Sequence, residues 1–128
     1  MKLGYIILYV PDVVASVDFW ERAFGLTRRF VHESGTYAEM ETGATALAFV
    51  AETMAAVHGI AVRHAYPHEQ PAAFEIALVT DDPAAALERA VAAGAAKVKE
   101  AEAMPWGQTI AYARDLNGVL VELCTPAA

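Results

Sequence analysis

Two carboxylates, Glu75 and Glu122, are the residues of this sequence best suited to chemistry. Each interrupts a short apolar run, FEIALV or VLVELC, and strand alternation places it opposite the aliphatic side chains of that run. If both face one cavity, the like charges raise one of the two pKa values, which creates a general base for proton transfer beside a carbonyl group. The alternative is structural: one glutamate pairs with a cation such as Arg114 or holds a backbone amide.

Aromatic side chains form the second group with binding chemistry. We expect stacking surfaces for a planar or cationic ligand at Tyr5, Tyr9, Phe49, Trp106 and Tyr112. The alternative for these rings is packing in the core or in a dimer interface. Trp106 follows a proline in a loop, which favours contact with a ligand or a partner. Trp20 lies on the apolar stripe of a predicted helix, and we expect it in the core.

The histidines and the cysteine are weaker candidates for a metal site or a catalytic nucleophile. His64 and His68 are four residues apart, the spacing of two helical ligands, but Pro67 between them argues against a regular helix. We therefore favour an exposed linker over a metal site there. Cys124 lies two residues after Glu122, so strand alternation places both side chains on the same face. The sequence places no histidine as a base for its thiol, so we expect Cys124 to fill space as a small apolar side chain.

Composition narrows the class of protein. The chain has 128 residues, of which 56% are hydrophobic and 20% charged, which suits one compact domain. Lys and Arg number 9 against 16 Asp and Glu, a net charge of −7 without a basic stripe. We therefore expect no nucleic-acid or membrane partner, and a field that favours cations. One cysteine and no signal-peptide pattern lead us to expect a cytoplasmic protein.

The elements that must position these residues occur twice. Apolar alternation predicts strands at 3–10, 27–33, 37–42 and 44–50, and again at 73–80, 96–103, 108–114 and 119–124. A helix follows Asp12 and ends at Gly25, and a second opens at Asp82-Pro83 and ends at Gly94. We predict one domain, residues 1–128, with an N-terminal module 1–50, a linker 51–72 with room for one or two helical turns, and a C-terminal module 73–128.

The two modules can be aligned by their turns and strands. YIILYVPD at 5–12 aligns with EIALVTDD at 75–82, and Gly43 aligns with Gly118. On this alignment Tyr5 takes the place of Glu75 and Leu47 takes the place of Glu122. We therefore expect Leu47 to point to the same side as Glu122, together with Thr45 and Phe49.

Several short signatures in order carry a family resemblance. They are VDFWERAFGL, DDPAAAL, PWGQ and the terminal DLNGVLVELCTP, and they resemble the vicinal oxygen chelate superfamily over about Leu3 to Pro126. This superfamily includes glyoxalase I, extradiol dioxygenases, and fosfomycin and bleomycin resistance proteins. The resemblance implies an α+β fold of two βαβββ modules, each a curved mixed sheet with a helix on its back. The modules would form a cup, usually within a homodimer.

The resemblance also locates four inward positions at which metal enzymes of this superfamily carry His, Gln or Glu. Here they are Tyr5, Leu47, Glu75 and Glu122, and only Glu122 matches the usual ligand. We therefore expect no resident metal or other cofactor, although Glu75 and Glu122 could bind a divalent cation weakly. The His-His-Glu set of dioxygenases and fosfomycin enzymes is absent, so we do not expect those activities.

Two functions remain open. The first is a binding protein, as in antibiotic resistance, that sequesters an aromatic or cationic ligand. Its acidic and aromatic cavity would be lined by Tyr5, Tyr9, Leu47, Phe49, Glu75, Trp106, Tyr112 and Glu122. The second is a glyoxalase-type lyase or isomerase that acts on a small carbonyl compound, with Glu75 and Glu122 as base or weak metal ligands. The missing ligands at positions 5 and 47 favour the first, and the expected partners are a small molecule and a second copy of the chain.

Overall fold

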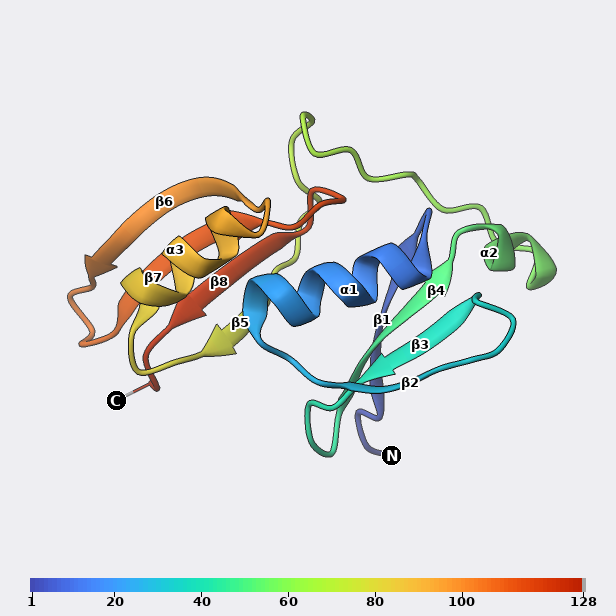
Figure 1. Ribbon diagram of the computed structural model, residues 1–128, viewed down its shortest axis with the longest axis horizontal. Helices are drawn as coiled ribbons and strands as arrows, with labels where there is room; N and C mark the ends of the chain where they lie inside the picture. The colour runs from blue at the N-terminus through green and yellow to red at the C-terminus, as the bar shows by residue number, and fades with distance from the viewer. Residues whose placement is uncertain (128) are drawn as a thin grey trace. The chain divides into compact units, whose positions relative to one another are not determined.

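The computed structural model describes residues 1–127, and the chain divides into two compact units, residues 1–64 and residues 65 onward (Figure 1). Each unit contains a four-stranded sheet with one long helix packed on it. Each unit therefore closes its own core and is described by itself. No helix among the described residues is long and apolar enough to cross a membrane.

The first unit has the order βαβββ followed by a short helix. In chain order its elements are β1 (Tyr5–Val10), α1 (Val13–Phe24), β2 (Arg28–Val31), β3 (Tyr37–Met40), β4 (Ala46–Ala51) and α2 (Thr53–Val57). The strands lie in the order β1-β4-β3-β2, with β1 parallel to β4 and the other pairs antiparallel. The one or two helical turns expected after residue 50 are confirmed as α2.

Helix α1 begins and ends at the residues that the sequence predicts. The Asp12 carboxylate accepts a hydrogen bond from the backbone N–H of Ala15 at 3.0 Å, and Gly25 ends the helix with a left-handed φ of 68°. Its inner side buries Trp20 completely, with the ring centroid 5.9 Å from that of Phe49. The expectation that Trp20 lies in the core is confirmed, and burial of each such ring contributes about 1.5–3 kcal/mol.

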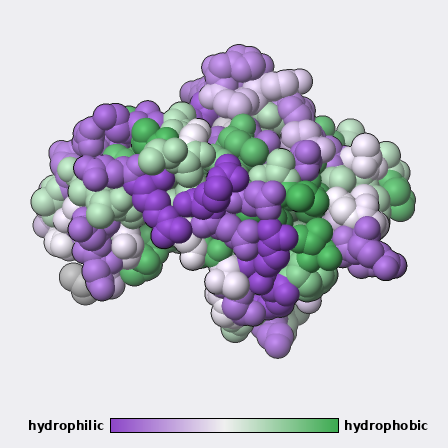
Figure 2. All heavy atoms as spheres, in the orientation of Figure 1, coloured by the Kyte–Doolittle hydropathy of each residue, from purple (hydrophilic) through white to green (hydrophobic). Residues whose placement is uncertain are grey.

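The outer side of the first unit is polar, because α1 and β2 are joined by an ion-pair fork. The Arg28 guanidinium of β2 lies 2.7 Å from Asp18 Oδ1 and 2.7 Å from Glu21 Oε1, both on α1. Figure 2, in the orientation of Figure 1, shows hydrophilic residues gathered over α1 and toward β2. The fork therefore joins this helix to the outer strand of its sheet by ion pairs.

The register of β4 corrects one expectation from the sequence. Ile6 of β1 pairs with Leu47, and Leu8 pairs with Phe49, so Leu47 and Phe49 share the face of the sheet that α1 covers. Phe49 is fully buried there, and Leu47 is only 5% exposed. The placement of Leu47 and Phe49 on the inward face was therefore wrong. Ala48, not Leu47, is the residue of β4 that corresponds to Glu122.

The second unit repeats the order βαβββ. Its elements are β5 (Ile76–Val79), α3 (Pro83–Ala92), β6 (Ala96–Ala103), β7 (Thr109–Arg114) and β8 (Leu120–Cys124). The strands lie in the order β5-β8-β7-β6, with β5 parallel to β8 and the other pairs antiparallel. The α+β class and the duplicated βαβββ order are therefore confirmed. The predicted strand 73–80 is shorter than expected, so Glu75 lies just before β5.

Helix α3 starts as predicted and ends slightly earlier. Asp82 accepts a hydrogen bond from the backbone N–H of Ala85 at 3.0 Å, and Pro83 occupies the first helical position. The last helical residue is Ala92, and Gly94 follows the cap with φ of 111°. Leu87 is buried on the side of α3 that packs on its sheet.

A staple around Gly118 fixes the segment that leads into the second unit. Arg114 Nε donates to Gly118 O at 2.9 Å, and its Nη2 donates to Tyr66 O at 3.2 Å. A Cβ at Gly118 would lie 2.7 Å from Tyr66 O, and φ there is 89°. Glycine is therefore required at this turn by both backbone conformation and space.

Candidate functional site

The open face of the second sheet, meaning the side that α3 does not cover, gathers the polar residues of this unit. Glu122 of β8 pairs with Ala77 on one side and with Tyr112 on the other, so these side chains share that face. Cys124 lies two residues farther along β8, and Glu75 lies two residues before Ala77. We call Glu75, Tyr112, Glu122 and Cys124 the acidic face.

Tyr112 and Glu122 are joined by a hydrogen bond. The Tyr112 hydroxyl donates to Glu122 Oε1 at 2.9 Å, and both side chains are half-buried. Burial and the neighbouring Glu122 carboxylate raise the pKa of Tyr112 to about 12. Tyr112 is therefore a neutral donor at physiological pH, directed at an acceptor.

The two glutamates of the acidic face have opposite pKa shifts. Burial and the neighbouring Glu122 raise the pKa of Glu75. Burial alone would also raise the pKa of Glu122, but hydrogen bonds from Cys124, Tyr112 and Glu75 outweigh it and lower that pKa. The pair therefore holds its negative charge on Glu122, with Glu75 the easier of the two to protonate.

Arg114 does not neutralise this pair. Its guanidinium is bonded to the carbonyl oxygens of Gly118 and Tyr66, so the alternative in which it pairs with Glu75 or Glu122 is wrong. Within its own unit, as far as the chain is described, Glu122 pairs with no lysine or arginine. The acidic face therefore presents an ionised carboxylate without a protein cation.

The thiol of Cys124 is unreactive in these surroundings. It is 4% exposed, and its sulfur lies 3.8 Å from Leu78 O. Burial and the Glu122 carboxylate raise the pKa of its thiol to about 11. Because the thiolate is the reactive form, Cys124 is a poor nucleophile at neutral pH.

The open face of the first sheet carries an analogous Tyr–Glu pair that the sequence analysis missed. Tyr37 donates to Glu39 Oε2 at 2.7 Å, and burial together with Glu39 raises the pKa of that phenol. Arg29 Nη1 lies 3.0 Å from Glu39 Oε1, so this carboxylate, which is 8% exposed, has a cation beside it that it shares with Glu41. The signal was present: Tyr37 and Glu39 alternate with the apolar Ala38 and Met40 in YAEM.

The other aromatic candidates lie apart from the acidic face in the chain. Tyr5 and Tyr9 belong to β1, on the open face of the first sheet, and are 55% and 36% exposed. Trp106 lies in the turn between β6 and β7, 60% exposed, where its indole N–H donates to Gln108 Oε1 at 2.8 Å. Of the expected ligand-binding residues, the structure brings Glu75, Tyr112 and Glu122 together.

The two histidines around Pro67 do not form a helical pair. They lie in the irregular segment after α2, and His64 Nδ1 is 2.6 Å from Glu52 Oε2. The His68 ring lies 5.6 Å from the ring of Tyr66. In these contacts each histidine meets a side chain other than the second histidine.

Comparison with known protein families decides the class of this fold. Residues 2–123 match the model of the Glyoxalase/Bleomycin resistance protein/Dioxygenase superfamily. The chain belongs to this superfamily. A search of curated proteins finds no match.

Solved structures agree with the superfamily fold. A glyoxalase-related enzyme from Fulvimarina pelagi is 24% identical, with a TM-score of 0.82 over 98% of this chain and 88% of that chain. A glyoxalase/bleomycin resistance protein/dioxygenase family enzyme from Burkholderia phytofirmans PsJN is 18% identical, with a TM-score of 0.84 over 98% of each chain. TioX from Micromonospora sp. ML1 is 23% identical, with a TM-score of 0.71 over 98% of each chain. At these identities the likeness concerns the fold.

The residues of this superfamily member do not fit a tightly held metal. The four relevant positions are Tyr5, Ala48, Glu75 and Glu122, and alanine provides no ligand atom. Among residues 1–127, no group of three His, Cys, Asp or Glu side chains is arranged to hold a metal ion. Catalytic metals usually need three protein ligands, so no step below is routed through one.

Proposed function

We propose that this superfamily member is a small-molecule binding protein that takes a planar organic cation on its acidic face. The observation that supports it is the contrast between two tyrosine-bonded carboxylates. Glu39 has Arg29 at 3.0 Å, a cation that it shares with Glu41, whereas Glu122 pairs with no lysine or arginine among the described residues of its own unit. A ligand cation would supply the missing charge.

The chemistry of the surrounding groups favours the same class of ligand. The Tyr112 ring next to Glu122 offers a π surface, which attracts cations as well as planar rings. An anion would meet the ionised Glu122 and, on most of the surface, a chain of net charge −7. Sequestration of such a ligand, as in antibiotic resistance, remains our prediction for its biological role.

The opposite pKa shifts of the two glutamates favour a second candidate function, a lyase or isomerase acting on a small carbonyl compound. Ionised Glu122 would accept a proton from the carbon beside the carbonyl group, and protonated Glu75 would donate one to the carbonyl oxygen. The product of this step is an enol. Where the carbon beside the carbonyl group carries a hydroxyl, this enol is an enediol. Protonated Glu122 would then return its proton to the former carbonyl carbon while ionised Glu75 takes the proton of the second hydroxyl, which completes an isomerisation without an oxidant or a metal.

A binding experiment tests the first proposal. Proflavine, a planar cation, should raise the melting temperature of the protein more than neutral acridone or anionic anthracene-9-carboxylate. Glu122→Gln should keep the fold and weaken proflavine binding in calorimetry by about tenfold, the size expected when a partly buried charge pair is lost. Glu69→Gln, an exposed carboxylate of the same unit, is the matched control.

The outcomes separate the candidates. Equal binding of acridone and proflavine, or an unchanged affinity in Glu122→Gln, would overturn the cation proposal. Incorporation of solvent deuterium into dihydroxyacetone, catalysed by the parent and lost in Glu122→Gln, would support the isomerase instead. Glu75→Gln should slow that exchange as well, because it removes the proton donor.

A further inference from the structure

The two sheets can be aligned strand by strand through their pairing. Across the first sheet one row of partners is Ile6, Leu47, Met40 and Arg28. Across the second sheet the corresponding row is Ile76, Val121, Ala113 and Lys97. Lys97 of β6 therefore occupies the position that Arg28 occupies in β2.

The long helices align through their caps. Both begin after a capping aspartate, Asp12 or Asp82, 70 positions apart. Within the helices Asp18 therefore corresponds to Glu88, and Glu21 corresponds to Val91. The three residues of the fork in the first unit, Arg28, Asp18 and Glu21, have Lys97, Glu88 and Val91 as their counterparts.

The corresponding residues of the second unit do not form an ion-pair fork between helix and strand. Lys97 Nζ lies 2.6 Å from Glu100 Oε1 on its own strand, instead of bridging to the helix. The Glu88 carboxylate has no hydrogen bond or ion pair with any described residue. Val91 stands where the second carboxylate of the fork would be, so α3 and β6 are not joined by charge.

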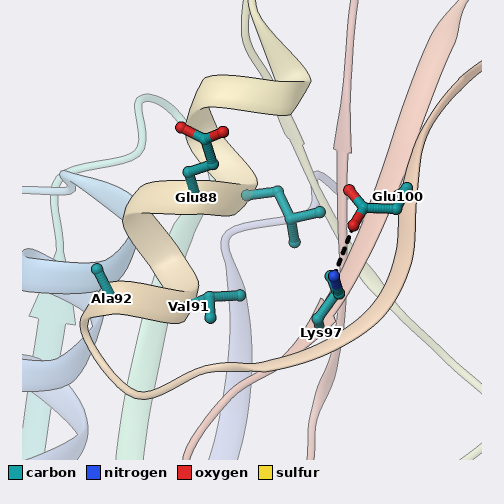
Figure 3. Close-up of a pocket in the computed structure, with 6 residues that line it drawn as sticks. Glu88, Val91, Ala92, Lys97 and Glu100 are labelled. Atoms are coloured by element: carbon teal, nitrogen blue, oxygen red, sulfur yellow. Dashed lines mark hydrogen bonds and ion pairs between the residues drawn. The ribbon is translucent and has the colours of Figure 1, made fainter.

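A cavity lies where the fork is missing. It has a volume of about 410 Å³ and is lined by Leu87, Glu88, Val91, Ala92, Lys97 and Glu100. Figure 3 shows Val91 directed from α3 toward the strand that carries Lys97 and Glu100, with the ion pair on the far wall. The volume lies within the range of small-molecule sites, about 300–1,000 Å³.

The lining indicates which ligand would fit. Leu87, Val91 and Ala92 form an apolar wall, while Glu88 adds a carboxylate that pairs with no described residue. Lys97, the cation of the lining, is paired with Glu100. In the first unit the corresponding position of the sheet holds an arginine side chain, an apolar stem that ends in a guanidinium between two carboxylates. Guanidinium matches carboxylate geometry better than a neutral amide does.

We propose that the cavity between α3 and β6 is a binding site for a small guanidinium compound with a short aliphatic stem. The stem would lie on Val91 and Leu87, and the guanidinium would bind Glu88. This site lies on the helix-covered side of the sheet, opposite the acidic face, so it is independent of the function proposed above.

The test uses n-butylguanidinium as the probe, followed by amide chemical shifts in heteronuclear NMR. We expect saturable shifts confined to residues of α3 and β6, and none with n-butylurea, which has a similar shape without the charge. Glu88→Gln should weaken binding about threefold to fivefold, the change expected for a solvent-exposed ion pair. Glu122→Gln and Glu69→Gln should leave it unchanged.

A second variant rebuilds the arrangement of the first unit. Val91→Glu with Lys97→Arg restores the fork residues, so the new arginine should fill the cavity and abolish the shifts while the spectrum stays folded. Equal binding of butylurea, unchanged affinity in Glu88→Gln, or shifts elsewhere in the chain would each overturn the proposal. Persistent binding in a folded double variant would do the same.

Discussion

Tyr112 and Glu122 are direct partners across β7 and β8, and the phenol donates to the carboxylate over 2.9 Å. The hydrogen bond favours the ionised form of Glu122, because an acceptor that receives a proton donor is stabilised as the anion. The sheet register therefore places both residues and also sets the charge of the acidic face.

Removal of the Tyr112 hydroxyl should lower the stability of the folded protein by an amount that depends on pH. Tyr112→Phe should lower the melting temperature at pH 7 by about 5–12 °C, since a hydrogen bond to a charged acceptor contributes about 1.5–3 kcal/mol. Because the pKa of Glu122 is lowered by folding, this contribution is present above its ordinary pKa and is lost as the pH falls through the folded value. Calorimetry at pH 7 and pH 3 measures the difference.

Tyr5→Phe is the control, because Tyr5 is 55% exposed and its phenol interacts with the Tyr37 phenol rather than with a carboxylate. It should melt like the parent at both pH values. A loss in Tyr112→Phe that is the same at both pH values would contradict a charge-assisted bond.

Glu75 should change the pH dependence of stability in the direction opposite to Glu122. Its folded pKa is raised, so the folded protein keeps a proton that the unfolded chain releases, and stability falls as the pH rises from the ordinary value through the folded one. Glu75→Gln removes this effect. The melting temperature of the variant, relative to the parent, should therefore increase by about 1–2 °C between pH 4 and pH 7, a small change because Glu75 is largely exposed. The reverse trend would show that folding favours the ionised form of Glu75.

The corrected register of β4 can be tested with two aliphatic residues from neighbouring strands. Leu47→Ala should destabilise the protein by about 2–4 kcal/mol in urea denaturation, because Leu47 is buried under α1. Ile7→Ala, on the open face and 44% exposed in the single chain, should cost less than about 1 kcal/mol at a protein concentration low enough to keep both variants monomeric. Similar costs for the two variants would contradict this assignment of faces.

A two-fold homodimer remains our prediction for the assembly. β1 is an edge strand of its sheet, and its Tyr5, Ile7 and Tyr9 side chains are exposed. Such an edge is a surface that soluble proteins usually cover. Sedimentation velocity at micromolar concentration should show a dimer, and Ile7→Lys should shift it toward monomer, whereas Val57→Lys on α2 should not. A monomeric parent protein would contradict the prediction.

The duplicated fold could be predicted from the sequence because its signals are local. Asp12 and Asp82 act as caps, Gly25 ends α1, and period-two alternation marks the strands, so each element is specified by a few neighbouring residues. The family signatures then fixed their order. The acidic face could be predicted in part for the same reason: Tyr112 and Glu122 follow from alternation within β7 and β8, and Glu75 from its continuation to the residue before β5.

The faces of β4 could not be predicted, because they depend on pairing between distant strands. Alignment of Gly43 with Gly118 is off by one residue at Ala48, and a slip of one residue moves every side chain to the other face. Leu47 and Ala48 are both apolar, so alternation within β4 does not choose between them. The ion pair of Glu39 with Arg29 was equally hidden, since Arg29 lies on a different strand.

Because Cys124 is buried, the rate at which its thiol is modified measures local opening of the sheet at the acidic face. It is the only cysteine of the chain, and its thiol is both covered and held protonated by its surroundings. A soluble thiol reagent can modify it only after the end of β8 has separated from β5. The rate of modification therefore reports how often this part of the sheet opens, without any introduced label, and a ligand held by Glu122 would slow it.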